Sequence, residues 1–322
     1  MKLVISLDVE EEGLFSGRYP RESGATNVAE LRRLEFIPRE FGLPLTLLVS
    51  YRVARDPAAC QVLARWRDLY RAEIGVHLHP WSTPPFVDLD RPEPVPAEQL
   101  PLALLRDKFA HLVQAVQASL GMTPASFRMG RFDFGPQVLG LLPEFGLQVD
   151  SSIVPLTLNG AGAYFLAPAD PFPLSPDLLE VPLTLVPVVA RLPRILARLA
   201  PLCPGASGRR LLSWFKYWGA AGIQPAWFPP ASMRLAAGLH RRRGGRTLTL
   251  FFHSSELKPG ASRLFPTEAA VAAFVAKIRA FLTWLVKTGP VEGVTLSELY
   301  QERGQQKGRF ENRPYKQFQG KN

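Results

Sequence analysis

The sequence predicts an α/β protein folded as a distorted (β/α) barrel of seven or eight strands, with an irregular basic insertion. Apolar runs of strand length alternate with longer stretches whose apolar residues recur at helical spacing, the pattern of parallel α/β folds. About eight such strands occur in 322 residues, more than an open sheet of this length needs. A closed or nearly closed barrel therefore fits better than an open sheet.

The predicted strands are short and apolar, and the first begins almost at the N-terminus. A continuous apolar run follows Lys2 and reaches a carboxylate at Asp8, which indicates a buried first strand rather than a secretory leader. In chain order, the predicted strands are residues 3–8, 44–50, 73–79, 126–128, 147–150, 179–185, 247–253 and 291–295.

The stretches between these strands are amphipathic and predict helices. One of the longest ends before Gly121 and Pro124, two residues that commonly follow a helix C-terminus. The predicted helices are residues 28–41, 57–71, 97–120, 136–145 and 267–288.

Residues 1–303 are expected to form one barrel domain. Within it, residues 155–246 are rich in proline and interrupt the strand–helix rhythm, so we interpret them as an insertion, part lid and part surface helix. Residues 304–322 are polar and rich in Gly, Gln and Lys, which predicts a disordered basic tail.

The net charge of +10 is concentrated in two segments. Between Val181 and Ser255 there is no Asp or Glu, and eleven Lys or Arg residues give this stretch a charge of +11. Residues 303–322 hold six basic residues and Glu311, which gives +5. The remainder of the chain is therefore mildly acidic, at −6.

Several classes of protein are disfavoured by motifs that the sequence lacks. It contains no G-x-S-x-G nucleophile motif, no Walker loop and no G-x-G-x-x-G, which argues against serine hydrolases, nucleotide hydrolases and dinucleotide-binding enzymes. Cys60 and Cys203 show no paired spacing, so we expect no disulfide framework and a cytoplasmic location. We expect no nucleic acid partner.

Five polar residues lie at or near the C-terminal ends of predicted strands. In (β/α) barrels, catalytic groups gather at that rim because the loops that follow the strands meet there. This coincidence is the strongest argument within the sequence for an enzyme. The five residues are Asp8, His77, Arg128, Asp150 and His253.

The segment EIGVHLHPW at residues 73–81 suggests a metal site. Residues i and i+2 of a strand point to the same side, so His77 and His79 face one way. Two neighbouring imidazoles suit a divalent metal such as zinc, which also needs a third ligand and an open position for water. Asp8 and Glu10 offer carboxylates, one for the metal and one to take a proton from water. We expect burial to raise the pKa of Asp8 toward useful basicity.

Five segments then follow one order along the chain: DVE at residues 8–10, GVHLH at 75–79, FRMGRFDFG at 127–135, VDSS at 149–152 and LFFH at 250–253. This order resembles the five motifs of the polysaccharide deacetylase (NodB-homology) family, carbohydrate esterase family 4, over roughly residues 1–300. Residues 73–81 and 252–257 are most similar to a branch found among bacterial surface-polysaccharide biosynthesis proteins.

The resemblance implies a barrel of the NodB-homology type that uses a divalent metal, Zn²⁺ by its ligands. It implies removal of an N-acetyl or other acyl group from an amino sugar or surface-glycan precursor. The implied catalytic residues are Asp8 as base, Arg128 orienting the base, Asp150 tuning the acid and His253 as the general acid. The implied metal ligands are Glu10, His77 and His79.

The chain departs from the family pattern at three points. The usual adjacent pair of aspartates is here Asp-Val-Glu, which leaves Glu10, Glu11 and Asp8 open as the carboxylate ligand. The metal histidines are two residues apart instead of four. Met129 and Gly130 replace the usual prolines after the arginine, so the substrate can differ from the common polymers of the family.

Residues 188–218 combine basic and aromatic side chains, and two interpretations are open. The first is an interfacial helix in peripheral contact with an anionic membrane, where it would meet a lipid-linked sugar. The second is an amphipathic helix packed on the barrel with its arginines solvated. Arg191, Arg194 and Arg198 share one helical side, and Lys216 lies among aromatic residues.

Three functions are weighed. The first is a metal-dependent deacylase acting on an acetylated carbohydrate, and the second is an amidase or cyclic-amide hydrolase that has the same fold. The third is a non-catalytic protein that binds a membrane or polyanion through its basic surface. The third does not explain the polar residues at the strand ends and ranks last.

Overall fold

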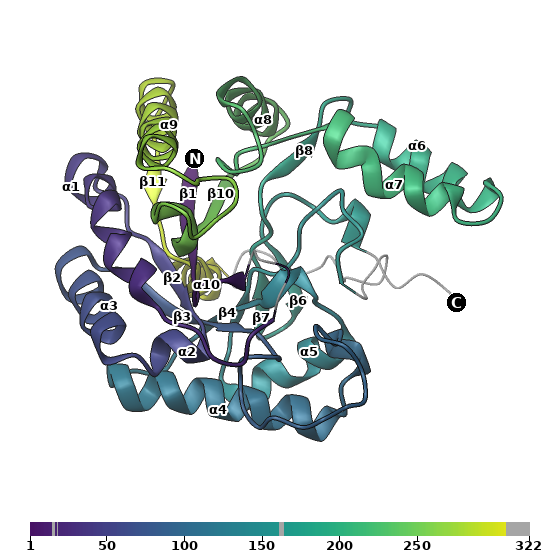
Figure 1. Ribbon diagram of the computed structural model, residues 1–322. Coiled ribbons are helices and arrows are strands. Elements are labelled where there is room, and N and C mark those ends of the chain that lie inside the picture. Colours follow the sequence, from purple (N-terminus) through teal and green to yellow (C-terminus); the bar gives the residue numbers. More distant parts are fainter. Residues whose placement is uncertain (15–16, 18, 161–163, 307–322) are drawn as a thin grey trace.

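The computed structural model describes residues 1–14, 17, 19–160 and 164–306 of the chain. Nine strands form one curled sheet in the order β10-β1-β2-β3-β4-β5-β7-β6, with β11 also paired to β1. Helices surround this sheet on its outer side (Figure 1). The predicted α/β fold is therefore confirmed, as a curled half-barrel.

The strands are short, and all pairs in the large sheet are parallel except β6 with β7. A separate antiparallel pair is formed by β8 and β9. The strands are β1 (Lys2–Val9), β2 (Thr46–Val49), β3 (Glu73–Leu78), β4 (Ser126–Met129), β5 (Val149–Asp150), β6 (Phe172–Ser175), β7 (Leu178–Glu180), β8 (Leu185–Pro187), β9 (Ala220–Gly222), β10 (Thr247–His253) and β11 (Glu292–Gly293).

The helices alternate with the strands as the sequence predicts, and further helices occur in the insertion and after β11. The α-helices are α1 (Phe36–Phe41), α2 (Tyr51–Ala54), α3 (Pro57–Tyr70), α4 (Leu102–Leu120), α5 (Pro136–Leu141), α6 (Leu192–Leu199), α7 (Ser207–Trp218), α8 (Pro230–Arg242), α9 (Glu268–Lys287) and α10 (Leu296–Gln306). The 3₁₀ helices used below are η2 (Thr26–Leu34), η4 (Gly130–Phe132) and η8 (Ser254–Leu257).

The pleat of β1 divides its side chains between two environments. Leu3, Ile5 and Leu7 pack into the main core beneath the surrounding helices. Val4 belongs to a smaller cluster inside the barrel, and Asp8, four residues later, points to the same side. The inner side of β1 is thus apolar where the strand begins and polar where it ends.

The prediction of one continuous strand at residues 179–185 is wrong, because β7 ends at Glu180 and β8 begins at Leu185. After β7 the chain turns away from β5 and approaches β10. Leu183 donates its backbone N–H to the carbonyl oxygen of Ile153, and Thr184 donates its backbone N–H to the carbonyl oxygen of Thr249. These hydrogen bonds bridge the opening between β7 and β10 without a continuous ladder. The barrel is therefore curled and bridged rather than closed by strand pairing.

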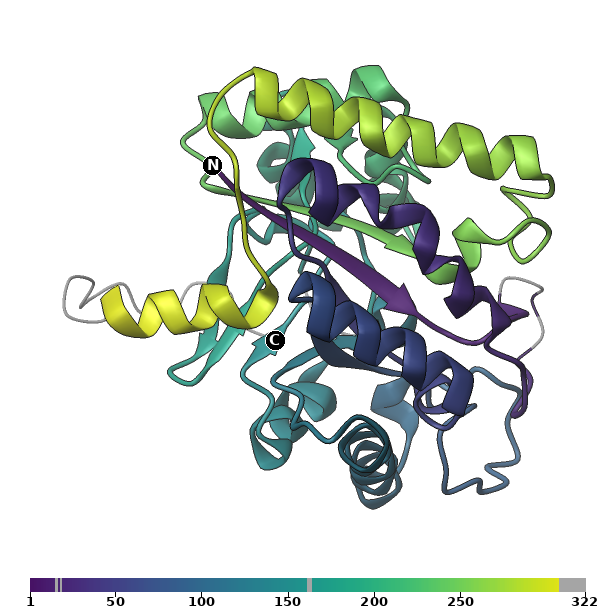
Figure 2. The same cartoon turned by 90° about the vertical axis from the view of Figure 1, so that its left-hand side faces the viewer.

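The end of the barrel where the strands begin is filled by α10. Leu296 and Leu299 join Val4, Leu48 and Val149 in one buried cluster. Figure 2 shows α10 on the side where β1 starts, away from the arrowhead of β1. The sequence interpretation missed this helix and placed residues 304–306 in a disordered tail, whereas α10 continues through Gln306. The rest of the predicted tail lies outside the described residues.

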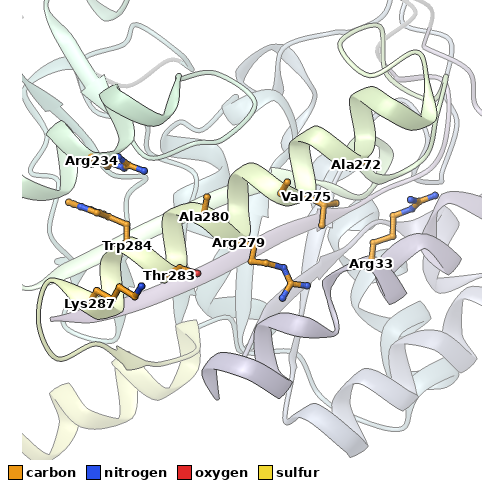
Figure 3. Close-up of a pocket in the computed structure, with 10 residues that line it drawn as sticks. Arg33, Arg234, Ala272, Val275, Arg279, Ala280, Thr283, Trp284 and Lys287 are labelled. Atoms are coloured by element: carbon orange, nitrogen blue, oxygen red, sulfur yellow. The ribbon is translucent and has the colours of Figure 1, made fainter.

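One helix of the described chain, α9, is long and apolar enough to span a membrane by length and composition alone. Its buried residues Phe274 and Ile278 pack into the main core of the barrel. On its outer side, a surface hollow of about 690 Å³ lies beside Arg279 and Trp284 and is flanked by Arg234 (Figure 3). This hollow is on the outside of the helix layer.

Candidate metal centre and the groups around it

The ends of β1, β3, β4 and β10 bring the predicted site residues together. Asp8 and His253 are register partners on β1 and β10, and His77 and Arg128 are register partners on β3 and β4. Partners in a parallel ladder point to the same side of the sheet. Glu10 lies just beyond the end of β1, and His79 lies just beyond the end of β3.

Glu10, His77 and His79 form a compact buried group. Oε2 of Glu10 lies 3.5 Å from Nε2 of His77 and 3.5 Å from Nε2 of His79. Ligand atoms of the three residues lie within 4.8 Å of one another, and no other such group occurs in the described part of the chain. Each side chain is no more than 3% exposed, so water does not solvate these atoms as it would on the surface.

These residues fit a divalent metal ion. Two atoms bound tetrahedrally to zinc at about 2.0–2.1 Å stand roughly 3.4 Å apart, close to the spacing found here. Oε1 of Glu10 is buried and has no hydrogen-bond partner among the described residues, which is costly unless an ion or a donor lies there. Nδ1 of His77 lies 3.0 Å from the carbonyl oxygen of Arg128, so it carries the proton and leaves Nε2 free to bind metal.

Glu11 faces Nδ1 of His79, the ring nitrogen on the other side from Glu10. Its Oε1 lies 3.5 Å from Nδ1 of His79, and its two oxygens accept hydrogen bonds from Ser82 at 2.5 Å and Ser50 at 2.6 Å. Burial alone would raise the pKa of Glu11, but the nearby His79 and the hydrogen bonds from the two hydroxyls lower it to about 2. Glu11 is therefore an ionised orienting group, and the geometry favours Glu10 as the carboxylate ligand.

Asp8 is paired with Arg128 at the centre of the rim. Nη1 of Arg128 donates to Oδ1 of Asp8 at 2.7 Å, and Nε and Nη2 donate to the carbonyl and hydroxyl of Ser151. The expectation of a raised pKa for Asp8 is wrong. Burial does raise it, but the electrostatic interactions with His77, Arg128 and His253 outweigh burial, and the pKa of Asp8 is lowered.

His253 lies at the end of β10, beside Asp8, and contacts the carboxylate of Glu256. Its Nδ1 is 3.0 Å from Oε1 of Glu256, and its backbone N–H donates to Oε2 of the same residue. Burial lowers the pKa of His253, but the charges of Glu10 and Glu256 outweigh it and raise the pKa to about 9. His253 is thus protonated at neutral pH, and its side chain is 13% exposed.

The expectation for Asp150 needs correction. Its register partners are Phe127 on β4 and Glu180 on β7, and Phe127 packs on Phe109 of α4, outside the barrel. Asp150 therefore points to the helix side of the sheet, opposite to Arg128, and accepts a 2.6 Å hydrogen bond from Ser152. Burial and the negative charge of Asp150 raise the pKa of the neighbouring Glu180 well above its usual value. The resemblance implied that Asp150 tunes the acid His253, but the carboxylate that contacts His253 is that of Glu256.

Backbone geometry at the rim leaves room beside the candidate metal group. A Cβ on Gly130 would collide with the ring of His79, so only glycine permits this approach of β4 to β3. Arg131 and Phe132 both have positive φ, at 58° and 56°, a strained pair that persists only when the surroundings enforce it. A cavity of about 230 Å³ opens beside this turn, lined in part by Trp81.

Sequence reasoning missed two residues that support the site, Ser151 and Glu256, and it considered Glu11 only as a possible metal ligand. Ser151 holds the guanidinium of Arg128, Glu11 orients His79, and Glu256 contacts His253. Glu256 had a local signal, because a glutamate three residues after a helix N-cap commonly accepts a hydrogen bond from the backbone N–H of that cap, and His253 is the N-cap of η8. Ser151 had none, since its contact depends on how β4 and β5 lie side by side.

Comparison with known proteins places the fold. No family model matches the chain, and no curated protein matches its sequence. A structure from Mycobacterium smegmatis, described as a polysaccharide deacetylase, is 19% identical, covers 97% of this chain and 94% of its own, and superposes with a TM-score of 0.57. A second structure, from Pseudomonas aeruginosa PAO1 and likewise described as a polysaccharide deacetylase, is 14% identical, with coverages of 96% and 92% and a TM-score of 0.58.

A third solved structure shares the fold but is named for a different activity. The structure of Puue allantoinase is 13% identical, covers 96% of this chain and 92% of its own, and has a TM-score of 0.55. The fold expected from the resemblance, that of the NodB-homology polysaccharide deacetylases, is therefore confirmed over nearly the whole chain. At these identities the likeness concerns the fold alone.

Proposed function

We propose that this protein is a metal-dependent hydrolase that removes an acetyl or other acyl group from the amino group of a sugar. The observation that carries the proposal is the buried group of Glu10, His77 and His79 beside an ionised Asp8 and a protonated His253. A base, an acid and a metal position at one rim are the parts that amide hydrolysis requires.

Glu10, His77 and His79 would hold the metal, for which we propose zinc because of its preference for imidazole and carboxylate ligands. When bound, such an ion polarises the acyl carbonyl and makes water acidic enough to attack near neutral pH. Nδ1 of His77 and Nδ1 of His79 are turned toward Arg128 and Glu11, so both imidazoles present Nε2 to the ion.

The remaining groups would move protons. Asp8 takes the proton of the attacking water on Oδ2, because Oδ1 is engaged by Arg128. His253 gives its proton to the departing amine nitrogen, and Glu256 stabilises the imidazolium that this role requires. Arg128 keeps Asp8 ionised and fixed in orientation. The products are a free amino sugar and a carboxylic acid.

For the substrate we propose an acetylated carbohydrate. The named activity of two solved structures that share the fold supports this class, as does the cavity beside the Gly130 turn, which could receive a sugar ring. A second candidate is a non-sugar amide, since Puue allantoinase shares the fold at a similar TM-score. Release of acetate from acetylated amino sugars, compared with hydrolysis of cyclic amides, separates the two.

The first experiment is the metal content of the purified protein, measured by elemental analysis. We expect about one zinc per chain, and its loss in the His77→Ala/His79→Ala variant. His111→Ala is the matched control because His111 is exposed on α4, away from the rim. A metal-free wild type that stays metal-free after incubation with zinc would contradict the proposal, as would equal losses in the two variants.

A further inference from the structure

Two helices of the insertion, α6 and α7, lie against each other and project from one side of the barrel (Figure 1). We call residues 188–218 the hairpin. Its basic side chains make no ion pair with any residue in the described ranges, whereas elsewhere Arg33, Arg106 and Arg279 each pair with a glutamate. The unpaired basic residues of the hairpin are Arg191, Arg194, Arg198, Arg209, Arg210 and Lys216.

The hairpin also exposes large apolar side chains. Of the seventeen large hydrophobic residues that are exposed among those described, eight lie in these 31 positions. Leu202 is 78% exposed, Tyr217 75% and Trp214 65%. The exposed residues of each helix recur three or four positions apart, which aligns them in one stripe per helix. The eight are Val188, Val189, Ile195, Leu199, Leu202, Trp214, Tyr217 and Trp218.

The opposite side of the hairpin is attached to the wall of the candidate site. Phe215 of α7 and Leu196 of α6 pack in one cluster with Phe132 and Phe251. The ring of Phe251 lies 4.8 Å from the guanidinium carbon of Arg128. Packing on the barrel therefore accounts for the inner side of the hairpin, and it leaves the exposed apolar stripe and the unpaired charges unexplained.

We propose that the outer side of the hairpin binds the surface of an anionic lipid bilayer, and thereby brings the rim to a lipid-linked form of the sugar substrate. The substrate part rests on the proposed function. Arginines would contact lipid headgroups while Trp214, Tyr217 and Leu202 enter the boundary below them. A nucleic acid partner would use the charges and the aromatic rings, but the aliphatic residues would gain nothing from it.

The test is sedimentation of the full-length protein with lipid vesicles. We expect binding to vesicles of equal phosphatidylglycerol and phosphatidylcholine, weaker binding at high salt, and little binding to pure phosphatidylcholine. Arg194→Gln/Arg198→Gln should lower the partition coefficient about twenty-fivefold, since each of the two headgroup contacts contributes about fivefold. Leu199→Ser/Trp214→Ser should also weaken binding and reduce the blue shift of tryptophan fluorescence that vesicles produce.

Arg55→Gln/Lys287→Gln is the matched charge control, because both residues are exposed and lie outside the hairpin. If it weakens binding as much as the hairpin variants do, net charge explains the binding and the proposal is wrong. Failure of the wild type to bind any vesicle, or binding only to an RNA homopolymer, would also overturn it. His77→Ala/His79→Ala should bind vesicles like wild type, so that failure of the membrane proposal can be told from failure of the proposed chemistry.

Discussion

Arg128 donates a 2.7 Å hydrogen bond to Asp8 across 120 positions of the chain, from the end of β4 to the end of β1. The arginine is fully buried, and its other N–H groups are used by Ser6 and Ser151. Oδ2 of Asp8 lies 3.6 Å from Nε2 of His77. The pair thus connects Asp8, the proposed base, to His77 of the candidate metal group.

Removing Arg128 should destabilise the protein strongly. In Arg128→Met, the buried charge of Asp8 loses its partner, and the expected loss is about 3–5 kcal/mol in the free energy of unfolding. The double variant Asp8→Asn/Arg128→Met should lose less than the two single losses together, because neither charge remains. Urea denaturation at pH 7 measures both effects.

A surface pair serves as the control for this cycle. Arg106 and Glu144 form an ion pair at 2.8 Å in which each side chain is 45% exposed. Arg106→Met should therefore cost less than about 1 kcal/mol. Losses of equal size at Arg128 and Arg106 would show that the buried pair carries no special stabilisation.

Glu11→Gln should weaken metal binding without removing a ligand. The change takes away the charge that faces Nδ1 of His79, and loss of such an orienting group typically costs 10–100-fold in metal affinity. Competition with a chromophoric chelator measures the change. Glu22→Gln, at an exposed position, should leave the affinity as it is, and an unchanged affinity in Glu11→Gln would argue that His79 is oriented by other contacts.

Gly130→Ala should displace the ring of His79. The added Cβ would collide with that ring and with the carbonyl of Leu78, so the variant should bind metal more weakly and be less stable. Gly140→Ala is the control, since a Cβ there meets open space in α5 and should stabilise that helix by up to about 1 kcal/mol. Equal metal affinities in both variants would contradict the close approach of β4 to β3.

The pKa of His253 should depend on Glu256. In the metal-free protein it is about 9, and Glu256→Gln should lower it because a nearby negative charge is lost. The imidazole resonances, identified with a His253→Gln variant, follow this titration by NMR. A value that remains near 9 in Glu256→Gln would assign the effect to the other carboxylates.

The same shift predicts how stability depends on pH. A histidine whose pKa is higher in the folded chain stabilises the fold fully below its ordinary value of 6.5, and this contribution disappears as the pH rises through about 9. Glu256→Gln should therefore lose more stability at pH 6 than at pH 10. Denaturation midpoints of the metal-free protein at the two pH values provide the comparison.

The sequence by itself determined the strands β1 and β10 and the polar residues Asp8 and His253 at their C-terminal ends. Long apolar runs bounded by polar residues are local signals, and the alternation of a strand sets which side chains share a face, so the common direction of His77 and His79 was predictable. The family resemblance added the order of the motifs and, with it, the expected fold.

Only the tertiary structure decided which groups meet. That Glu10 rather than Glu11 lies near Nε2 of both imidazoles depends on how the chain leaves β1, and the position of Asp150 depends on its register with Phe127. The side of the insertion that faces outward is likewise set by packing against Phe132 and Phe251. Such contacts join residues far apart in the chain, and local patterns of hydrophobicity do not encode the register and orientation that create them.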